Sequence, residues 1–403
     1  MNVFKNWNAI YKGILIVQIM LMIDSFFRIF DLESSQALSL LRYFMYFFGV
    51  YWLCKGIKGN HYTTPFIYKL FLLWVLYIVI TALPELLNPT QNYVAFKAFI
   101  SGKLFLYVIP FLMCADLGTS TLRSLFRLSY LMGACYMIIA IPIYIGDMMN
   151  LSAATSESIT FLLEGAIILL LTYSYHNKKT KVISIIAVLI AIVIMMLLAR
   201  RNKVVFYGGG LSLAIILNVL SGKISGGRKF LIVLVTLAGF IFFISADNIF
   251  GGFFDKMETG MSSREQVIDD FTNDFNRTPN DWIFGRGLFG EFDGGVLNTN
   301  EETGLRDAIE NGYLQLILKG GWIWLGLLIL ISINSIYNGL FRSNNIFVKG
   351  CACLIVLYYL DMVGFGVPVT SLKYIMVFIS ISICSSPRWR AYSDEELKTQ
   401  LSI

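Results

Sequence analysis

The chain has 403 residues, of which 57% are hydrophobic and 14% are charged, against roughly 25% charged residues in soluble domains. This composition excludes a disordered chain, a collagen-like fibre and a disulfide-stapled secreted module, and it predicts one large membrane-embedded unit. The net charge of +6 does not indicate a nucleic-acid partner, because residues 246–308 carry 13 acidic and 5 basic side chains. The positive excess therefore falls mainly in short loops between apolar segments.

Apolar segments recur along the chain, each about long enough for a helix that crosses the ~30 Å hydrocarbon core of a bilayer. Twelve are found, at residues 11–30, 36–54, 65–83, 93–114, 121–145, 153–175, 182–199, 204–220, 229–245, 313–335, 347–366 and 369–384. The seventh and eighth are close together, so they form either a tight helical hairpin or one long broken helix. We therefore predict an all-α polytopic protein with about 12 transmembrane helices.

Lys and Arg residues lie in alternate short loops, and loops of this kind stay in the cytoplasm. The alternation predicts that both termini are cytoplasmic and that one large loop lies outside the membrane. The chain then divides into membrane helices (1–245), the outer loop with a short amphipathic helix (246–308), further membrane helices (309–385) and a cytoplasmic tail (386–403).

Arg200, Arg201 and Lys203 break this rule, because they place three cations in a short loop on the outer side. One explanation is an error in the number of spans. Another is that these side chains extend from a helix end to the membrane surface. The alternative is an anion-binding site, since cations placed against the topology need a compensating partner.

Ionisable residues inside the predicted spans lie toward the same outer side. Each costs roughly 2.5–3.5 kcal/mol at mid-membrane, so it faces a partner or a cavity. Asp24 and Arg28 are predicted to pair, and the other residues of this set are Lys97, Lys103, Glu157, Glu164, Asp361 and Lys373. Structural pairing is the alternative for the whole set. The confinement of these charged residues to one leaflet instead favours a cationic cavity, which would suit a ligand that carries phosphates.

The outer loop contains two recognisable patterns. Residues 263–275 place Val267, Phe271 and Phe275 at helical spacing, which predicts a short amphipathic helix. Gly285–Gly290 fits the G-x-G-x-x-G dinucleotide pattern, but no βαβ unit surrounds it, so we reject that interpretation. The glycines instead predict a tight turn, either as plain structure or as a backbone nest for an anion beside Arg286.

Glu310 and Asn311 open the apolar helix that follows the outer loop. The helix dipole favours an anion at this position and keeps a carboxylate ionised, as a general base must be. Glu310 is therefore either a general base or a capping carboxylate.

Several motifs in residues 199–327 together resemble the superfamily of O-antigen polymerases and O-antigen ligases, the Wzy/WaaL-like membrane glycosyltransferases. They include an Arg at the outer end of a middle span (Arg200 or Arg201) and Ser263-Arg264 before the amphipathic helix. They also include Gly285-Arg286-Gly287, and Glu310-Asn311-Gly312-Tyr313-Leu314 with Gly321. One large late loop after many spans is a further shared feature.

The resemblance implies a GT-C-like fold and metal-independent, inverting glycosyl transfer without a cofactor. The donor and the acceptor would be undecaprenyl-diphosphate-linked glycans at the periplasmic face of the bacterial inner membrane. Arg200, Arg201 and Arg264 would bind the diphosphate, and Asn311 and Tyr313 would orient the sugar. From the charge pattern, Lys103 is a further candidate for diphosphate binding, and Arg286, Glu164 and Lys97 are further candidates for substrate binding. A chain-length regulator and a flippase are the implied protein partners, and membrane lipid surrounds the chain.

The chain departs from the family at one position. The family's proposed base is a His, whereas Glu310 stands here, and His61 and His176 fall in predicted cytoplasmic loops. Glu310 is then the base, or this branch works without a base at that position. The missing His favours a polymerase over a ligase. A lipid-linked oligosaccharide flippase or a secondary transporter is the alternative from another class, but no internal repeat supports it.

Overall fold

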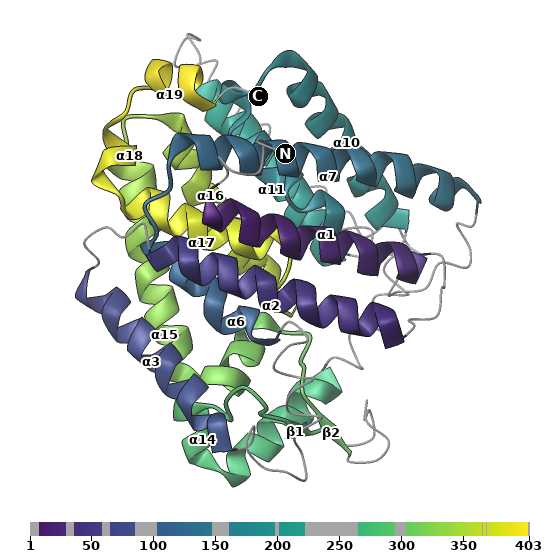
Figure 1. Cartoon of the computed structure of the whole chain (residues 1–403), viewed down its shortest axis with the longest axis vertical. Coiled ribbons are helices and arrows are strands. Elements are labelled where there is room, and N and C mark those ends of the chain that lie inside the picture. The colour runs from purple at the N-terminus through teal and green to yellow at the C-terminus, as the bar shows by residue number, and fades with distance from the viewer. Residues whose placement is uncertain are drawn as a thin grey trace.

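The computed structural model of the chain consists almost entirely of helices (Figure 1). The structure describes residues 8–29, 36–58, 65–84, 103–146, 161–197, 201–221, 265–294, 304–364, 366–367 and 369–401. Within these ranges, four helices are long and apolar enough to cross a membrane: Ala9–Phe27, Lys178–Met196, Asn202–Val219 and Gly312–Phe341. This agrees with the predicted all-α membrane architecture.

The helices follow the predicted apolar segments within a few residues. They are α1 (Ala9–Ile29), α2 (Gln36–Lys58), α3 (Phe66–Thr81), α7 (Thr119–Gly146), α10 (Lys178–Leu197), α11 (Arg201–Ser221), α15 (Gly312–Phe341), α16 (Ile346–Met362) and α17 (Leu372–Ser385). Two predicted spans contain shorter elements: α6 (Phe105–Val108) with the 3-10 helix Ile109–Cys114, and α9 (Ala166–Leu171) with the 3-10 turn Tyr173–Tyr175. The ninth predicted span lies outside the described residues.

α10 and α11 are separate helices that pack against each other. This arrangement favours the helical hairpin over one long broken helix for the seventh and eighth predicted spans. The connection between them, with Arg200, lies outside the described residues.

α17 forms the centre of the bundle. Each of its side chains from Leu372 to Cys384 is buried, and the helix packs against α15, α16 and the 3-10 helix Ile109–Cys114. A helix that is apolar on nearly all sides avoids water either in a protein core or in a membrane, and here the neighbouring helices cover it. α1 and α2, in contrast, pack mainly against each other and lie side by side in Figure 1.

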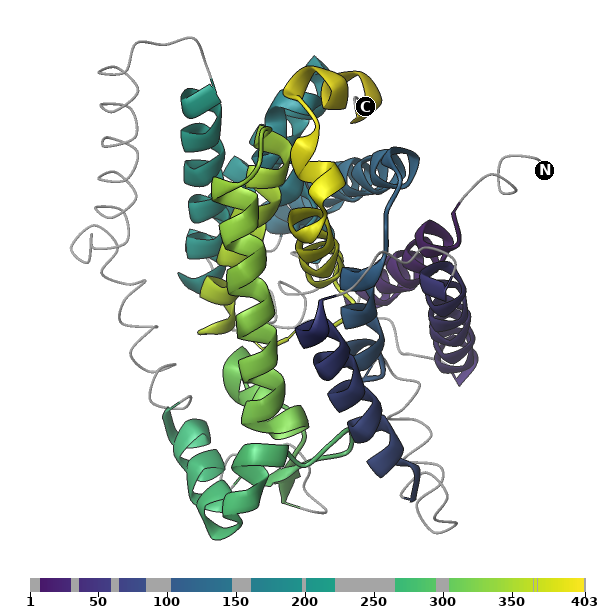
Figure 2. The same cartoon turned by 90° about the vertical axis from the view of Figure 1, so that its left-hand side faces the viewer.

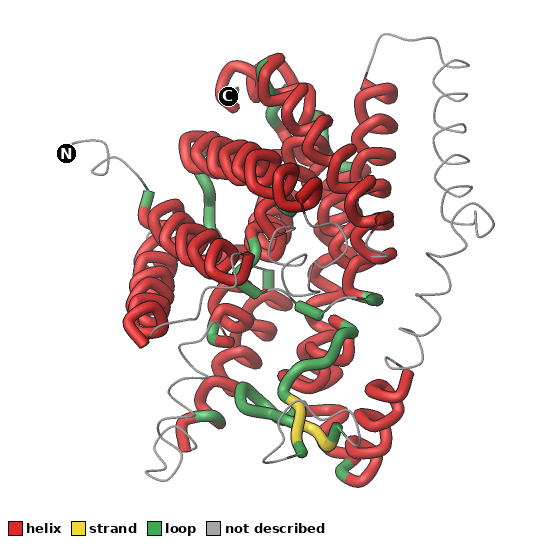
Figure 3. The backbone as a smooth tube through the Cα atoms, turned by 90° about the vertical axis from the view of Figure 1, so that its right-hand side faces the viewer, coloured by secondary structure: helices red, strands yellow, loops and turns green. Residues whose placement is uncertain are grey.

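The described residues of the predicted outer loop form a small unit at one end of the bundle, and we call it the outer unit after its predicted location. It contains a helix at residues 265–277, α14 (Pro279–Phe284) and an antiparallel pair of two-residue strands, β1 (Phe292–Asp293) and β2 (Leu305–Arg306), drawn in yellow in Figure 3. We call this end of the bundle the ribbon end. Val267, Phe271 and Phe275 are buried, and this confirms the predicted amphipathic helix for residues 265–275. Aromatic contacts of Phe271 with Trp282 and Phe292 form the core of the unit.

The predicted C-terminal tail forms two helices at the end of the bundle opposite the ribbon end (Figure 2). These are α18 (Pro387–Ala391) and α19 (Asp394–Leu401). Trp389, Leu397 and Leu401 are buried, and Asn345 donates to the carbonyl oxygens of Trp389 and Tyr392 at 2.9 Å each. The apolar side chains between the charges of this segment explain why it packs against the bundle.

Candidate functional site

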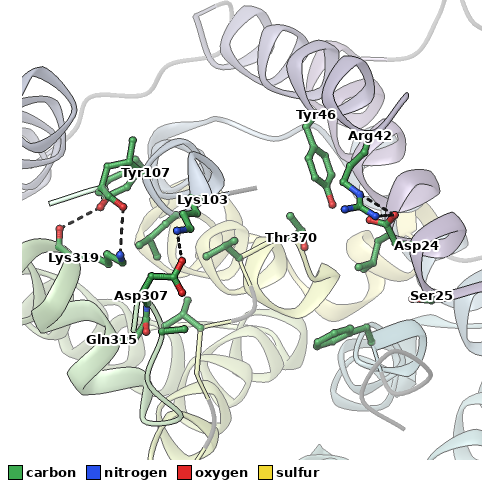
Figure 4. A pocket seen from close by; sticks show the side chains of 17 residues that line it. Asp24, Ser25, Arg42, Tyr46, Lys103, Tyr107, Asp307, Gln315, Lys319 and Thr370 are labelled. Atoms are coloured by element: carbon green, nitrogen blue, oxygen red, sulfur yellow. Dashed lines mark hydrogen bonds and ion pairs between the residues drawn. The ribbon is translucent and has the colours of Figure 1, made fainter. Parts of the chain in front are cut away.

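A cavity of about 320 Å³ lies where the loop before α15 meets α1, α2 and the segment before α6 (Figure 4). Three cations and two carboxylates are among its described lining residues: Arg42, Lys103, Lys319, Asp24 and Asp307. Tyr46, Tyr107 and Phe161 add aromatic surface, and Ser25, Gln315 and Thr370 add uncharged polar groups. The cavity therefore combines positive charge with groups that bind hydroxyls and stack on sugar rings.

Two ion pairs face each other across the cavity in Figure 4, and we call them the cavity pairs. In the first, the Lys103 ammonium binds Oδ2 of Asp307, and their side chains are 31% and 41% exposed. In the second, Arg42 donates from Nε and Nη2 to Oδ1 of Asp24 at 3.1 and 2.8 Å. The sequence predicted Arg28 as the partner of Asp24, and the side chain of Arg28 lies outside the described residues.

The neighbours of Asp307 favour the charged form of its carboxyl group. Partial burial alone would raise the pKa of its carboxyl group, but the Lys103 ammonium, with a smaller contribution from Lys319, holds the pKa below its usual value. The two cations therefore reduce the basicity of this carboxylate.

α15 is kinked just after Lys319, one of the residues that line the cavity. Gly321 has φ +70°, inside the left-handed region that glycine reaches without strain, and it interrupts the helix. The carbonyl oxygens of residues 318–320 accept hydrogen bonds from other elements. The donors are the backbone N–H of Arg286, the Tyr107 hydroxyl and the Trp74 indole N–H, at 2.7, 3.2 and 2.9 Å respectively.

The kink also brings α14 against α15. A Cβ atom placed on Gly321 would lie 2.0 Å from the carbonyl oxygen of Ile283, so only glycine fits this contact. Gly285, which ends α14 at φ +71°, approaches the backbone of Gly320 and Gly321 in the same way. The predicted glycine turn is confirmed, and its function includes the attachment of the outer unit to the membrane helix.

Lys319 lies in the short helical segment before the kink and is 3% exposed. Its ammonium donates to the carbonyl oxygens of Leu288 and Gly290, at 3.4 and 2.5 Å. A buried ammonium needs such partners, because an unsatisfied charge in an apolar interior is very costly. Lys319 thus joins the glycine turn to the cavity wall.

Glu310 is exposed and is not among the described residues that line the cavity. Asn311 is the N-cap of α15: its Oδ1 accepts from the backbone N–H groups of Tyr313 and Leu314 at 3.0 and 3.2 Å. The side-chain cap is therefore Asn311 rather than Glu310. The Tyr313 hydroxyl donates to the carbonyl oxygen of Tyr359 at 2.9 Å, so both predicted sugar-binding residues make contacts within the protein.

Arg286 is enclosed by the outer unit. Its guanidinium donates to Asp281 at 2.7 Å and to Asp274 at 2.5 Å, and it lies over the ring of Phe275. It also donates to the carbonyl oxygen of Glu291 at 2.8 Å. These contacts make Arg286 a structural cross-link between the two helices and the turn, and the anion nest of backbone N–H groups beside it stays a prediction.

Glu164 belongs to a second set of charges, deep in the bundle. Oε1 of Glu164 accepts from Lys203 and Lys373 at 2.9 Å each, and Lys373 also donates to Asp361 at 2.5 Å. We call these four residues the buried quartet, and none of their side chains is more than 5% exposed. Glu164, predicted to bind substrate, is buried in this quartet and is not among the described residues that line the cavity.

Of the predicted site residues, the structure places Lys103 on the cavity. Arg200, Arg264 and Lys97 lie outside the described residues, and Arg201 begins α11 with a side chain that is not described. Sequence analysis missed Arg42, Lys319 and Asp307. A signal was present for Lys319 and Arg42, because both are ionisable residues inside otherwise apolar helices.

Among the described residues, no group of three or more His, Cys, Asp or Glu side chains is placed to hold a metal ion. Comparison with protein families, curated proteins and solved structures finds no match for this chain. The resemblance to O-antigen polymerases and ligases therefore rests on the quoted motifs alone.

Proposed function

We propose that this protein is a membrane glycosyltransferase that polymerises oligosaccharide repeat units carried on undecaprenyl diphosphate, giving an O-antigen or capsule-type polysaccharide. The observation that carries the proposal is the cavity with Arg42, Lys103 and Lys319 in its wall. Transfer of a glycan from a lipid diphosphate develops negative charge on the leaving group, and fixed cations stabilise that charge.

The rest of the cavity suits the sugars of the same substrate. Aromatic rings bind the apolar faces of sugar rings, and Gln315 and Thr370 offer hydrogen-bonding groups for hydroxyls. The predicted topology completes the proposal: about twelve spans in a GT-C-like arrangement, both termini in the cytoplasm and the cavity open to the periplasm of a bacterial inner membrane. Arg200, Arg201, Arg264 and Lys97 are further candidates for the diphosphate and the sugar.

The test uses the purified full-length protein in lipid nanodiscs with synthetic undecaprenyl-diphosphate-linked repeat units. We expect a ladder of products with added repeats, which Lys103→Ala strongly reduces at limiting donor concentration and Lys69→Ala leaves unchanged. Lys69 is the control because it is an exposed lysine of α3, away from the cavity.

Other outcomes separate the alternatives. No ladder from the wild-type protein would refute a polymerase. Transfer of a finished chain to a lipid A core acceptor would identify a ligase, and movement of an intact lipid-linked unit across the bilayer would identify a flippase. Normal ladders from Lys103→Ala would remove the cavity from the proposal.

A further inference from the structure

Two carboxylates lie close to the start of α15, and only one of them faces the cavity. Asp307 is a lining residue, whereas Glu310, three residues later, is exposed and is not among the described lining residues. A general base must reach the proton that it removes, so its position is considered before its acidity. Its position therefore favours Asp307 over Glu310 as the general base.

The backbone around Asp307 is held in place by Gln315. Oε1 of Gln315 accepts from the backbone N–H of Ile309 at 2.7 Å, and Nε2 donates to the carbonyl oxygen of Asp307 at 3.5 Å. The loop is thereby fixed to the first turn of α15. A reacting group fixed in this way keeps the geometry that a proton transfer requires.

Lys103 binds Asp307 in the free protein, and both side chains remain partly open to the cavity. A ligand with two phosphates competes for the Lys103 ammonium more strongly than a single carboxylate does, because it carries more negative charge. A donor diphosphate that binds Lys103 would therefore release Asp307 from its partner.

We propose that Asp307 is the general base of the transfer, and that Lys103 holds it inactive until the diphosphate of the donor takes its place. This inference rests on the proposed function. In the step, the acceptor hydroxyl oxygen forms a bond to the anomeric carbon while the bond from that carbon to the diphosphate oxygen breaks. The hydroxyl proton passes to Asp307, and the electron pair of the broken bond leaves with the diphosphate, which Lys103 holds.

The electrostatics of the site make Asp307 a stronger base when the donor is bound. In the free protein, Lys103 and Lys319 lower the pKa of its carboxyl group against the opposing effect of burial. A bound diphosphate withdraws Lys103 and adds negative charge beside the carboxylate, and both changes raise the pKa. The other charged groups of the described cavity wall are Arg42 and Asp24, which pair with each other.

The experiment compares Asp307→Asn, Asp307→Glu and a matched control, Asp269→Asn, in the ladder assay. Asp269 is an exposed carboxylate of the outer unit, away from the cavity. We expect Asp307→Asn to slow transfer about 10²–10⁴-fold, the usual loss for a general base. It should retain binding of undecaprenyl diphosphate, measured with a fluorescent analogue, because the phosphate ligands remain. Asp307→Glu should recover part of the rate.

A pH profile separates a base from a structural residue. The wild-type rate should fall on the acid side as Asp307 becomes protonated, and the residual activity of Asp307→Asn should lose that dependence. If Asp307→Asn does not fold, the wild-type profile and Asp307→Glu still test the inference.

The inference fails if Asp307→Asn polymerises at the wild-type rate, or if Glu310→Gln abolishes transfer while Asp307→Asn retains it. The second result would assign the base to Glu310 and leave the proposed function intact. If the wild-type protein forms no ladder, the proposed function itself fails.

Discussion

The cavity pairs and the buried quartet contain the same kinds of side chain and differ in what surrounds them. The cavity pairs are part-exposed and line an open volume, with Lys103 31% and Asp307 41% exposed. The quartet lies among α11, α16, α17 and the segment before α9, and Lys373 is 0% exposed. The quartet joins helices, whereas the cavity pairs can exchange partners with a ligand.

The energetic difference follows from solvent access. A part-exposed ion pair contributes about 0–1 kcal/mol, so breaking it costs little stability. The removal of one member of a buried pair leaves an uncompensated charge and costs about 3–5 kcal/mol. Ionisable residues inside apolar helices therefore belong to two classes, and burial rather than residue type distinguishes them.

The largest expected effect is on the buried quartet. Lys373→Met leaves Glu164 and Asp361 with Lys203 as the one cation of the quartet, and we expect a loss of about 3–5 kcal/mol in the free energy of unfolding. Thermal unfolding in detergent, followed by intrinsic fluorescence, measures the change. Lys103→Ala is the comparison, with a shift within about 1 kcal/mol. Equal shifts in the two variants would remove the distinction between the two sets.

Substitution of Gly321, at the kink in α15, has the next largest expected effect on stability. Gly321→Ala should cost roughly 2–4 kcal/mol, because alanine is strained at this φ and its Cβ would overlap Ile283. Gly326→Ala is the control in the same helix, since a Cβ there meets nothing within 4 Å. It should change stability by less than about 1 kcal/mol, in the stabilising direction. Stability and ligand binding are measured on the same samples. A Gly321→Ala protein as stable as the wild type would show that the packing of α14 does not require the kink.

Binding of the diphosphate should depend on the cavity pairs. The loss of one charge-assisted hydrogen bond costs about 1.5–3 kcal/mol, so Lys103→Ala and Arg42→Ala should each weaken undecaprenyl diphosphate binding about 10–100-fold. Lys203→Met, from the quartet, should reduce stability instead. Microscale thermophoresis on folded protein gives the dissociation constants, and unchanged constants for both cavity variants would place the ligand elsewhere.

The smallest expected effect concerns Asn311. Its substitutions distinguish a role as the N-cap of α15 from a role in binding sugar. Asn311→Ala should cost about 1 kcal/mol through loss of the N-cap, and Asn311→Ser should restore it because serine caps equally well. Thermal unfolding measures stability, and the ladder assay measures transfer. Loss of transfer in a stable Asn311→Ser protein would support the predicted contact of Asn311 with sugar.

The helices were predictable because each follows from the hydropathy of its own segment. α10, α11 and α15 begin and end within a few residues of the predicted spans, except for the longer C-terminal end of α15. The partners of charged side chains were not predictable in this way. Lys103 and Asp307 are 204 residues apart in the sequence, and hydropathy does not indicate which helices become neighbours.

Two residues show the limit of motif-based prediction in the site. Arg286 stands in a glycine-rich pattern typical of anion binding, but Asp274 and Asp281 already occupy its guanidinium. Glu164 is a carboxylate in a predicted membrane span, and two lysines from distant helices bind it. In both cases the sequence identifies a charge that needs a partner, and only the tertiary structure identifies that partner.

The most direct test of the central claim is a cryo-electron microscopy structure of the protein with undecaprenyl diphosphate in a nanodisc. We predict density for the diphosphate in the cavity, in contact with Lys103, with the contact between Lys103 and Asp307 broken. Diphosphate density outside this cavity, with Lys103 still bound to Asp307, would contradict the account.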